Sequence, residues 1–174
     1  MSVLELKIDD ALMLRQYTAG DAVAIFDLIS RNRDHLSRDG ETTALKYGCW
    51  LDVMRSIMYA PNPQRLRFGL WHGDVLIGTR NIQINNDGTA ETGSYLGAQY
   101  QGKGYMRKAM NRMVQFAFED LKLREIYSVI AETNVRSINL VTKAGFVQDK
   151  HRKIPAAQET PAKLYFVKTN NTIY

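Results

Sequence analysis

The chain has 174 residues, 45% hydrophobic and 24% charged, which is the balance of one ordinary globular domain. Its single cysteine, Cys49, excludes an internal disulfide framework and a zinc site built on several cysteines. No run of about 18 apolar residues occurs, so no segment is typical of a membrane span. The acidic residues near the N-terminus differ from a signal peptide, and we expect a cytoplasmic domain over residues 1–174.

The formal net charge at pH 7 is +5, a moderate excess compatible with a ribosome, a nucleic acid or an anionic cofactor as partner. The cations are scattered except in RNRDHLSRD and KHRK, and the chain lacks the aromatic-basic repeats of single-strand binders. We therefore expect a solvated basic surface and no direct role with nucleic acids. The sequence leaves monomer and homodimer open.

The N-terminal third predicts a hairpin followed by two helices. Two short alternating strands flank Asp9-Asp10. Thr18, with Asp21 three residues later, resembles a capping box in which Asp replaces Glu, and an apolar face follows at helical spacing: Ala22, Ile25, Phe26 and Ile29. Residues 35–41 predict a polar loop. Residues 42–60 predict a second helix, ended by Pro61 and Pro63.

The remainder predicts an antiparallel meander and then alternating helices and strands. The meander strands cover residues 66–72, 75–84 and 89–97, with turns at 73–74 and 85–88. A third helix runs from about Gly104 to Leu121, with an inner stripe at spacings of three and four: Met106, Met110, Met113, Ala117 and Leu121. A strand at 125–132 precedes a short helix at 134–146, where Asn134 has the N-cap position and Gly145 the C-terminal one.

Two final strands, at 146–152 and 163–169, complete the expected fold. The fold class is α/β, with a mixed, mostly antiparallel central sheet flanked by helices.

The segment GAQYQGKGYMRKAM, residues 97–110, carries the clearest chemical signal. It joins a strand to the third helix, and the unpaired N–H groups at a helix N-terminus form an anion site. Gly102 and Gly104 remove the Cβ atoms that would hold a phosphate away, and Lys103, Arg107 and Lys108 add positive charge. These residues favour a phosphate or pyrophosphate cradle. The alternative is a glycine-rich turn with solvated cations.

Two better-known phosphate loops do not fit this segment. No Gly-Lys-Ser/Thr follows, so it is not a Walker A loop. The glycine spacing and the preceding antiparallel strands also differ from the dinucleotide-binding βαβ unit.

The loop residues Gln99-x-x-Gly102-x-Gly104 resemble the Q/R-x-x-G-x-G/A signature of the GNAT superfamily of N-acetyltransferases. TAETGSYLGAQYQGKGYMRKAM and ETNVRSINLVTKAGF are similar to two runs of its RimJ/RimL-like branch, which acts on ribosomal proteins. RNRDHLSRD is similar to the N-x-x-x-L loop after that branch's first helix. The resemblance covers most of the chain in order and implies the GNAT fold.

The resemblance implies acetyl-CoA as acetyl donor and co-substrate, and it assigns the donor site residue by residue. Backbone amides of the loop would hold the pyrophosphate: Gln101, Gly102, Lys103, Gly104, Tyr105 and Met106. In the family the strand before the loop splays from the next strand, and the pantetheine arm pairs with its edge, here Tyr95, Leu96 and Gly97. Asn134 matches an Asn that contacts the CoA arm, and it can serve as an N-cap as well.

The implied chemistry is direct attack of a neutral amine on the thioester, which needs a polarised carbonyl and a proton for the leaving thiolate. Ser137 matches the Ser of the family's N-x-x-S motif and is the expected proton donor. The alternative is a polar residue in the first helical turn. No acyl-enzyme is required, so Cys49 is expected to be a buried helix residue and not a nucleophile.

The sequence offers more than one candidate for the general base. Glu91 matches the Glu of the A-E-I-G run in the middle of a strand, where burial would raise its pKa toward that of a base. It could instead pair with an arginine on an exposed face. Glu132 and His151 are weaker candidates, and Ala156 stands near the place where some relatives carry an acid. His35 and His72 have no neighbours suited to a metal site, and no metal is expected.

The acceptor implied by the branch is a protein N-terminal α-amine, such as that of a ribosomal protein. A polyamine or aminoglycoside is the second enzymatic interpretation, and a non-catalytic acyl-CoA-binding or ribosome-binding module is the third. The charge of the acceptor groove separates the first two, because a cationic lip with Arg31, Arg33 and Arg38 beside it would repel a polycation.

Overall fold

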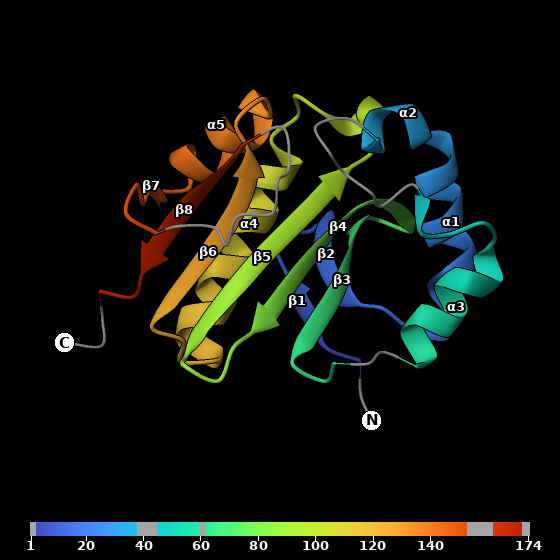
Figure 1. The fold of residues 1–174 in the computed structure, drawn as a ribbon. Helices are drawn as coiled ribbons and strands as arrows, with labels where there is room; N and C mark the ends of the chain where they lie inside the picture. Colours follow the sequence, from blue (N-terminus) through green and yellow to red (C-terminus); the bar gives the residue numbers. More distant parts are fainter. Residues whose placement is uncertain (1–2, 38–44, 60–61, 153–161, 172–174) are drawn as a thin grey trace.

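The computed structural model describes residues 3–37, 45–59, 62–152 and 162–171. These residues form one eight-stranded sheet with the strand order β1-β2-β3-β4-β5-β6-β8-β7 (Figure 1). Neighbouring strands are antiparallel except β5 and β6, which are parallel. The strands are β1 (Glu5–Lys7), β2 (Leu12–Gln16), β3 (Arg65–His72), β4 (Val75–Ile84), β5 (Thr89–Leu96), β6 (Glu125–Ala131), β7 (Val147–Gln148) and β8 (Lys163–Thr169).

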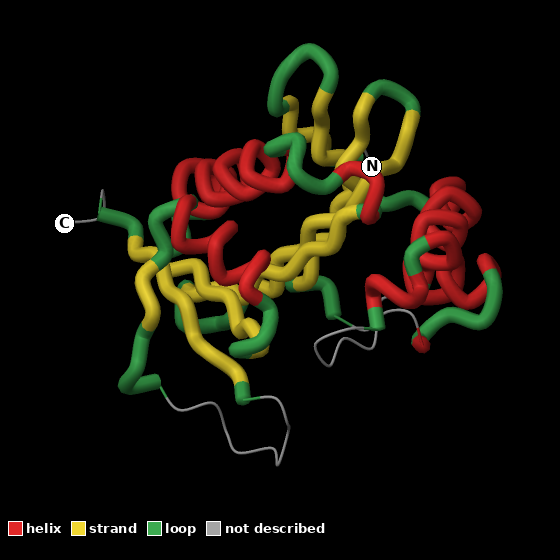
Figure 2. Tube along the Cα trace, turned by 90° about the horizontal axis from the view of Figure 1, so that it is seen from above, coloured by secondary structure: helices red, strands yellow, loops and turns green. Residues whose placement is uncertain are grey.

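Helices pack on the sheet in two groups, and Figure 2 shows them well separated. The first group is α1 (Ala22–Arg31), α2 (Arg33–Leu36) and α3 (Trp50–Met58). The second is α4 (Tyr105–Gln115), which continues as a π-helical turn (Phe116–Asp120), and α5 (Val135–Lys143). The predicted mixed α/β sheet flanked by helices is confirmed.

Each helix group has its own apolar core. The larger core lies between α4, α5 and the sheet and includes Phe68, Ile82, Met110, Met113 and Ile126, each at most 1% exposed. The smaller core joins α1 and α3 to the sheet through Ile25, Ile29, Val53 and Leu76. Neither core extends between the two helix groups, so a cleft can open there.

The predicted capping box at the start of the first helical segment is confirmed. An Asp21 carboxylate oxygen accepts the Thr18 backbone N–H at 2.7 Å, and the other oxygen pairs with Arg15 at 2.8 Å. The first turn is a 3₁₀ turn over Ala19–Asp21, and α1 begins at Ala22.

The second helix is shorter than predicted, and the polar loop before it is partly helical. His35 and Leu36 belong to α2, where Leu36 is buried. The helix expected over 42–60 begins only at Trp50, because Asp52 accepts the backbone N–H groups of Gly48 and Cys49 at 3.0 and 3.1 Å and fixes the start there. Cys49 is thus a half-buried N-cap and not the buried helix residue expected. Pro61 lies outside the described residues.

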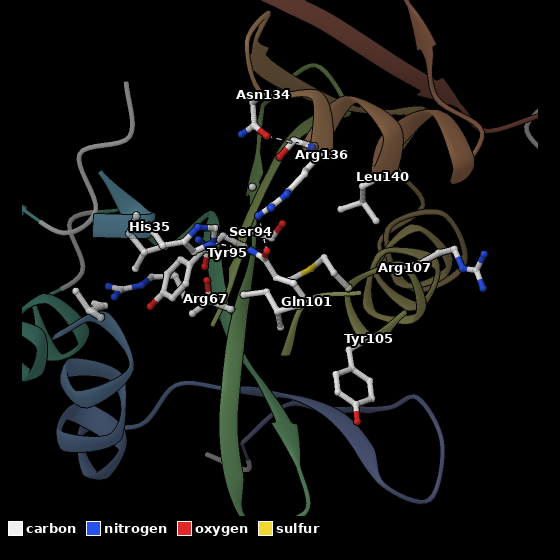
Figure 3. A pocket seen from close by; sticks show the side chains of 18 of the residues that line it. His35, Arg67, Ser94, Tyr95, Gln101, Tyr105, Arg107, Asn134, Arg136 and Leu140 are labelled. Carbon is white, nitrogen blue, oxygen red and sulfur yellow. Dashed lines mark hydrogen bonds between the residues drawn. The ribbon is translucent and has the colours of Figure 1, made fainter. Parts of the chain in front are cut away.

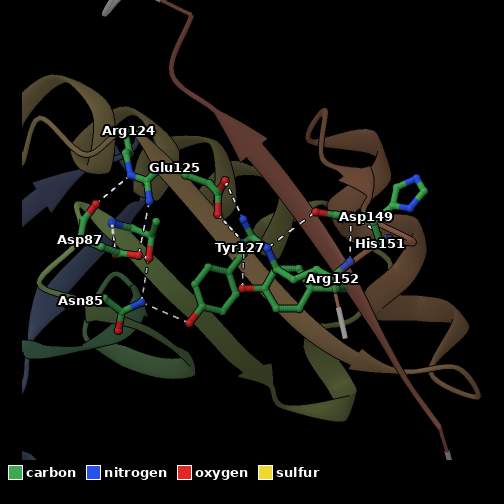
Figure 4. Close-up of polar contacts among 10 residues, drawn as sticks. Asn85, Asp87, Arg124, Glu125, Tyr127, Asp149, His151 and Arg152 are labelled. Atoms are coloured by element: carbon green, nitrogen blue, oxygen red, sulfur yellow. Dashed lines mark hydrogen bonds and ion pairs between the residues drawn. The ribbon is translucent and has the colours of Figure 1, made fainter. Parts of the chain in front are cut away.

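The strand predicted over 146–152 is confined to Val147–Gln148. The Asp149 carboxylate accepts the backbone N–H groups of His151 and Arg152 at 3.0 and 3.1 Å, which turns the chain out of the sheet. The turn aims the Arg152 guanidinium at Glu125, 2.6 Å away, and at the stacked rings of Tyr127 and Tyr165 (Figure 4).

The pairing of β5 with β6 stops early, and this positions the site. Their register covers only Thr89–Glu91 against Glu125–Tyr127. One further link, the Ser128 hydroxyl donating to the Thr92 carbonyl at 2.9 Å, closes the end of the paired region. Beyond it the two strands diverge toward α2 on one side and α5 on the other, as Figure 1 shows. Among the described residues, no helix is long and apolar enough to cross a membrane.

Candidate active site

A cleft of about 1600 Å³ opens where β5 and β6 diverge. Its walls come from the face of β3–β5, from α1 and α2, from the loop before α4, and from α5 (Figure 3). The cleft therefore joins the two helix groups across the sheet. It has room for an extended cofactor as well as a second substrate.

The loop before α4 has the geometry of an anion cradle. Gly102 and Gly104 have φ angles of +77° and +78°, a left-handed conformation that side chains rarely adopt. A Cβ atom added at either glycine would meet nothing within 4 Å, so the space beside the backbone is open. Gly104 is the N-cap of α4, whose first N–H groups point into this space. A phosphate group could thus reach the backbone directly.

The base of this loop is tied to α1 by a buried asparagine. The Asn32 side chain is 4% exposed, accepts the Ala98 backbone N–H at 2.8 Å and donates to the Leu28 carbonyl at 2.7 Å. Gly97 lies in the same contact, since a Cβ there would come within 3.2 Å of the Leu28 side chain. Asn32 and Leu36 are the Asn and Leu of the N-x-x-x-L loop, so this motif serves to hold the cradle.

The cleft lining is strongly cationic. Among the described residues that line it, seven are Lys or Arg and none is Asp or Glu. The cations are Lys46, Arg65, Arg67, Lys103, Arg107, Arg136 and Lys143. Lys103 and Arg107 flank the cradle, Arg136 and Lys143 lie on α5, and the other three are on the α1–α3 side. Such a lining attracts anionic ligands and repels polycations.

The Gln101 side chain spans the cleft. Its amide nitrogen lies 2.6 Å from the His35 ring on α2, and its oxygen accepts from Arg136 on α5. Figure 3 shows these side chains converging from opposite walls. Local sequence patterns do not predict His35 at this position, because 66 residues separate it from Gln101. From the sequence, His35 was considered only as a metal ligand, and its contact with Gln101 was not foreseen.

Two half-buried tyrosines, Tyr17 and Tyr95, line the cleft on the sheet side. Burial raises the pKa of Tyr17 and of Tyr95 well above the ordinary value, so both phenols stay protonated at neutral pH. The Arg67 guanidinium lies over the Tyr17 ring at 5.3 Å and donates to the Ser56 carbonyl at 2.8 Å. The phenol of Tyr95 reaches the cleft lining. Of these residues, only Tyr95 was predicted from the sequence to lie at the site.

Most of the residues expected at the donor site line the cleft. They are Tyr95, Leu96, Gln101, Gly102, Lys103, Gly104, Tyr105, Met106, Asn134 and Ser137. Asn134 is also the N-cap of α5, because its side-chain oxygen accepts the Ser137 backbone N–H at 3.1 Å. Gly97 and Gln99 are not among the lining residues. Gly97 is buried against α1, and Gln99 is exposed outside the cleft.

The residues expected as bases are placed differently. Glu91 is exposed and does not line the cleft, so the expected burial is wrong. Glu91 shares a sheet face with Gln83, its partner in the register, which does line the cleft. Glu132 and His151 are exposed and lie outside the lining. Ala156 falls outside the described residues.

The lip cations also differ from those expected. Arg31 is exposed and pairs with Asp27 at 3.4 Å, and Arg33 donates to the Tyr47 carbonyl at 3.1 Å. Neither lines the cleft, and Arg38 is outside the described residues. The groove is cationic as the hypothesis required, but through Lys46, Arg65 and Arg67. Within the described ranges, no group of three His, Cys, Asp or Glu residues could hold a metal ion.

Comparison with curated proteins gives partial matches to named acetyltransferases. The chain is 33% identical to spermidine N(1)-acetyltransferase of Vibrio cholerae over 63 residues, 36% of each chain. It is 23% identical over 152 residues to the Bacillus subtilis protein YdaF, which is named provisionally as a ribosomal N-acetyltransferase; this match covers 82% of the chain and 81% of YdaF. The matches to the first three curated relatives span only 36%, 49% and 44% of their lengths.

Solved structures share the whole fold. The ribosomal-protein-S5-alanine acetyltransferase of Vibrio fischeri superposes with a TM-score of 0.82 at 22% identity, covering 97% of both chains. RimL, an acetyltransferase of ribosomal L7/L12 solved with coenzyme A, gives a TM-score of 0.85 at 12% identity, covering 95% of this chain and 98% of RimL. The family described as Acetyltransferase (GNAT) domain matches residues 11–147. The chain belongs to this family, as its loop signature and its splayed strands predict.

Proposed function

We propose that this GNAT domain transfers an acetyl group from acetyl-CoA to a primary amine, and that the preferred acceptor is a protein N-terminal α-amine of the kind found on ribosomal proteins. The amine attacks the thioester directly, in a complex that holds both substrates. The observation that carries the proposal is the cradle of Gly102 and Gly104, opening into a cleft that has cationic lining residues and no carboxylate among those described.

The residues of the cleft fit coenzyme A. The left-handed glycines leave open space for the pyrophosphate, and Lys103 and Arg107 supply charge beside it. The unpaired edge of β5 at Tyr95 and Leu96 offers backbone groups to the amides of the pantetheine arm, as a neighbouring strand would. Asn134 bounds the gap from α5. Acetyl-CoA supplies the activated acyl group, and these residues bind and orient it.

The acceptor would enter from the side of α1–α3. There the sheet face presents Arg65 and Arg67 beside the neutral Thr79, Asn81 and Tyr95. Desolvation raises the pKa of Tyr95, so its phenol keeps its proton and can donate a hydrogen bond to a substrate without adding charge. An amine arriving here must lose a proton, and with Glu91 exposed we assign that step to water in the cleft. Ser137, which lines the cleft, remains the proposed proton donor to sulfur.

A polyamine acceptor is the alternative, and the partial identity to a spermidine acetyltransferase favours it. The cationic lining opposes it, because a polyamine needs carboxylates to compensate its charges. The ribosomal names of several relatives agree with a cytoplasmic protein acting on nascent or assembled ribosomal proteins.

The test is turnover of acetyl-CoA with a panel of acceptors at equal concentration. The panel contains peptides with free and blocked N-termini, spermidine and an aminoglycoside. We expect acetylation of free N-terminal peptides and none of blocked ones. Faster turnover of spermidine than of every peptide would replace the protein acceptor with a polyamine. CoA binding without turnover of any amine would favour a binding module.

A further inference from the structure

Arg80 is a buried cation without a carboxylate partner. It lies in the middle of β4, its side chain is 1% exposed, and it packs between the sheet and α4. No Asp or Glu of the described residues pairs with it, and its buried Nε has no hydrogen-bond partner there. Burial alone lowers the pKa of this guanidinium to about 9, so it is still charged at neutral pH.

An unpaired buried charge is costly, and a hydrophobic side chain of similar size would commonly be as stable or more stable at such a position. The contacts of Arg80 indicate what compensates this cost. Its guanidinium donates to the Ser94 hydroxyl oxygen at 3.0 Å and lies against the thioether sulfurs of Met106 and Met110. Ser94 and Met106 both line the cleft, so the charge lies directly behind the cleft wall.

Ser94 is held in one hydrogen-bonding role by this contact. Arginine has donors only, so the Ser94 oxygen must accept from Arg80, and the Ser94 proton is available to another group. No acceptor for that proton is described within the protein, and the side chain is exposed to the cleft. In Figure 3, Ser94 lies between His35 on one side and Leu140 on the other. Its hydroxyl is therefore a donor directed at whatever occupies the gap.

The end of the gap lies beside Ser94. The strands are paired up to Glu91, and the bond from Ser128 closes the gap at Thr92. The open part begins at Gly93 and Ser94 and continues to the cradle at Gly102. Coenzyme A held by its pyrophosphate at the cradle would extend its arm toward the closed end, and the thiol is the last atom of that arm.

We propose that the Ser94 hydroxyl donates a hydrogen bond to the sulfur of coenzyme A, and that Arg80 is a positioning residue that polarises this hydroxyl and places positive charge behind it. During transfer the amine nitrogen bonds to the acyl carbon, the C–S bond breaks, and its electron pair goes to sulfur. The proton lost from nitrogen passes to solvent. The Ser94 hydrogen bond stabilises the negative charge as it develops on sulfur. Ser137 then protonates the sulfur and regains its own proton from solvent.

The test titrates the thiol of CoA bound to excess protein, by the ultraviolet absorbance of the thiolate, with protein alone subtracted. The proteins are the parent, Arg80→Met, Ser94→Ala, Ser137→Ala and Arg55→Met. Arg55 is exposed on α3 outside the cleft lining, so Arg55→Met controls for the loss of one positive charge. The other cations near the gap are Lys103, Arg107, Arg136 and Lys143, and every variant keeps them.

We expect the thiol pKa of bound CoA to lie about 1 unit or more higher in Arg80→Met and in Ser94→Ala than in the parent and Arg55→Met. The kcat should fall in both variants while the KM for acetyl-CoA changes little. The double variant should lose no more than Ser94→Ala, because Arg80 acts through Ser94. Arg80→Lys, which retains charge, should recover part of the shift.

An unchanged thiol pKa in a folded Ser94→Ala protein overturns the proposal, whatever the outcome for Arg80. A shift in Ser137→Ala without one in Ser94→Ala overturns it too and assigns the sulfur to α5. If the parent binds no CoA, this assignment and the proposed function fail together. If the parent binds CoA and Ser94→Ala has the parental titration, only this assignment fails.

Discussion

At the scale of single residues, the two glycines of the cradle carry the most specific expectation. Gly102→Val would force a branched side chain into a left-handed conformation and fill space that is open beside the backbone. We expect CoA binding to weaken by about 2 kcal/mol or more, from lost hydrogen bonds and steric exclusion. Calorimetric titration of CoA measures this change.

A matched control for that substitution exists in the same chain. Gly73 has a φ of +56° with nothing within 4 Å of an added Cβ, but it lies in the β3–β4 turn outside the cleft lining. Gly73→Val should therefore cost stability without changing CoA affinity. Equal CoA affinity in a folded Gly102→Val protein would contradict the cradle.

Glu91 shows where residue-level reasoning from sequence fails. The sequence places it mid-strand and within a family motif, but it cannot tell how far the cleft extends along this face of the sheet. Because Glu91 is exposed outside the cleft lining, we expect Glu91→Gln to retain kcat/KM within about threefold at every pH, below the 10²–10⁴-fold of general acid–base catalysis. A large fall at neutral pH, recovered at high pH where the free amine is abundant, would restore Glu91 as the base.

At the scale of elements, most of the fold could be predicted, because the local sequence pattern and the tertiary packing favour the same secondary structure. The strands β4 and β8 match the predicted 75–84 and 163–169, and turn residues bound β4 on both sides. The start of α3 and the end of β7 were missed because single carboxylates, Asp52 and Asp149, capture backbone N–H groups and override propensity. The buried Arg80 and the bridge of Gln101 depend on contacts distant in sequence, which no local pattern reveals.

Asn134 at the start of α5 has two proposed roles, as helix N-cap and as a contact of the CoA arm, and two substitutions separate them. Its side-chain oxygen caps the helix by accepting the Ser137 N–H. Asn134→Ala should lower the free energy of unfolding by about 1 kcal/mol. Asn134→Asp keeps the cap, so it should retain the stability, yet it adds a negative charge beside the proposed CoA site and should weaken CoA binding. If Asn134→Asp binds CoA as tightly as the parent, the residue is a cap alone.

The β1–β2 hairpin is joined to α4 by an ion pair whose contribution depends on pH. Asp9 accepts from Lys108 at 2.7 Å and from the N–H groups of Ala11 and Leu12, and these bonds lower its pKa from 3.8 to about 2. A lowered folded-state pKa stabilises the protein above 3.8, and this stabilisation is lost as the pH falls through about 2. Asp9→Asn should therefore be less stable than the parent at neutral pH, and the difference should vanish near the lower value.

Urea unfolding at a series of pH values measures this difference. Asp10→Asn is the matched control, because the Asp10 side chain is fully exposed and, in the described part of the chain, pairs only with exposed Lys7. An Asp9→Asn protein whose stability parallels that of Asp10→Asn at every pH would show that the ion pair to α4 contributes nothing.

At the scale of the whole molecule, the two helix groups and the cleft between them form one charged channel. The cradle and α5 supply four of the described lining cations, and the acceptor side supplies Lys46, Arg65 and Arg67. A net charge of +5 is modest for the chain, so the absence of acids among the described lining residues is a local feature of the cleft. A charged substrate therefore experiences the cleft and not the average surface.

We expect the positive charge of the cleft to determine which acceptor is preferred. Reversing part of that charge should therefore shift the preference. Arg65 begins β3, is exposed at the cleft wall, and has no ion pair among the described residues, so its charge is not compensated. Arg65→Glu changes the charge of the acceptor side by two units at that point. We expect it to lower kcat/KM for peptides with acidic residues after the N-terminus and to raise kcat/KM for spermidine, each by several-fold, with both effects shrinking as salt screens the charges.

Arg31→Glu is the control, because Arg31 is an exposed arginine of α1 outside the lining. If Arg31→Glu shifts the acceptor preference as much as Arg65→Glu does, the net charge of the protein, and not the cleft, selects the acceptor.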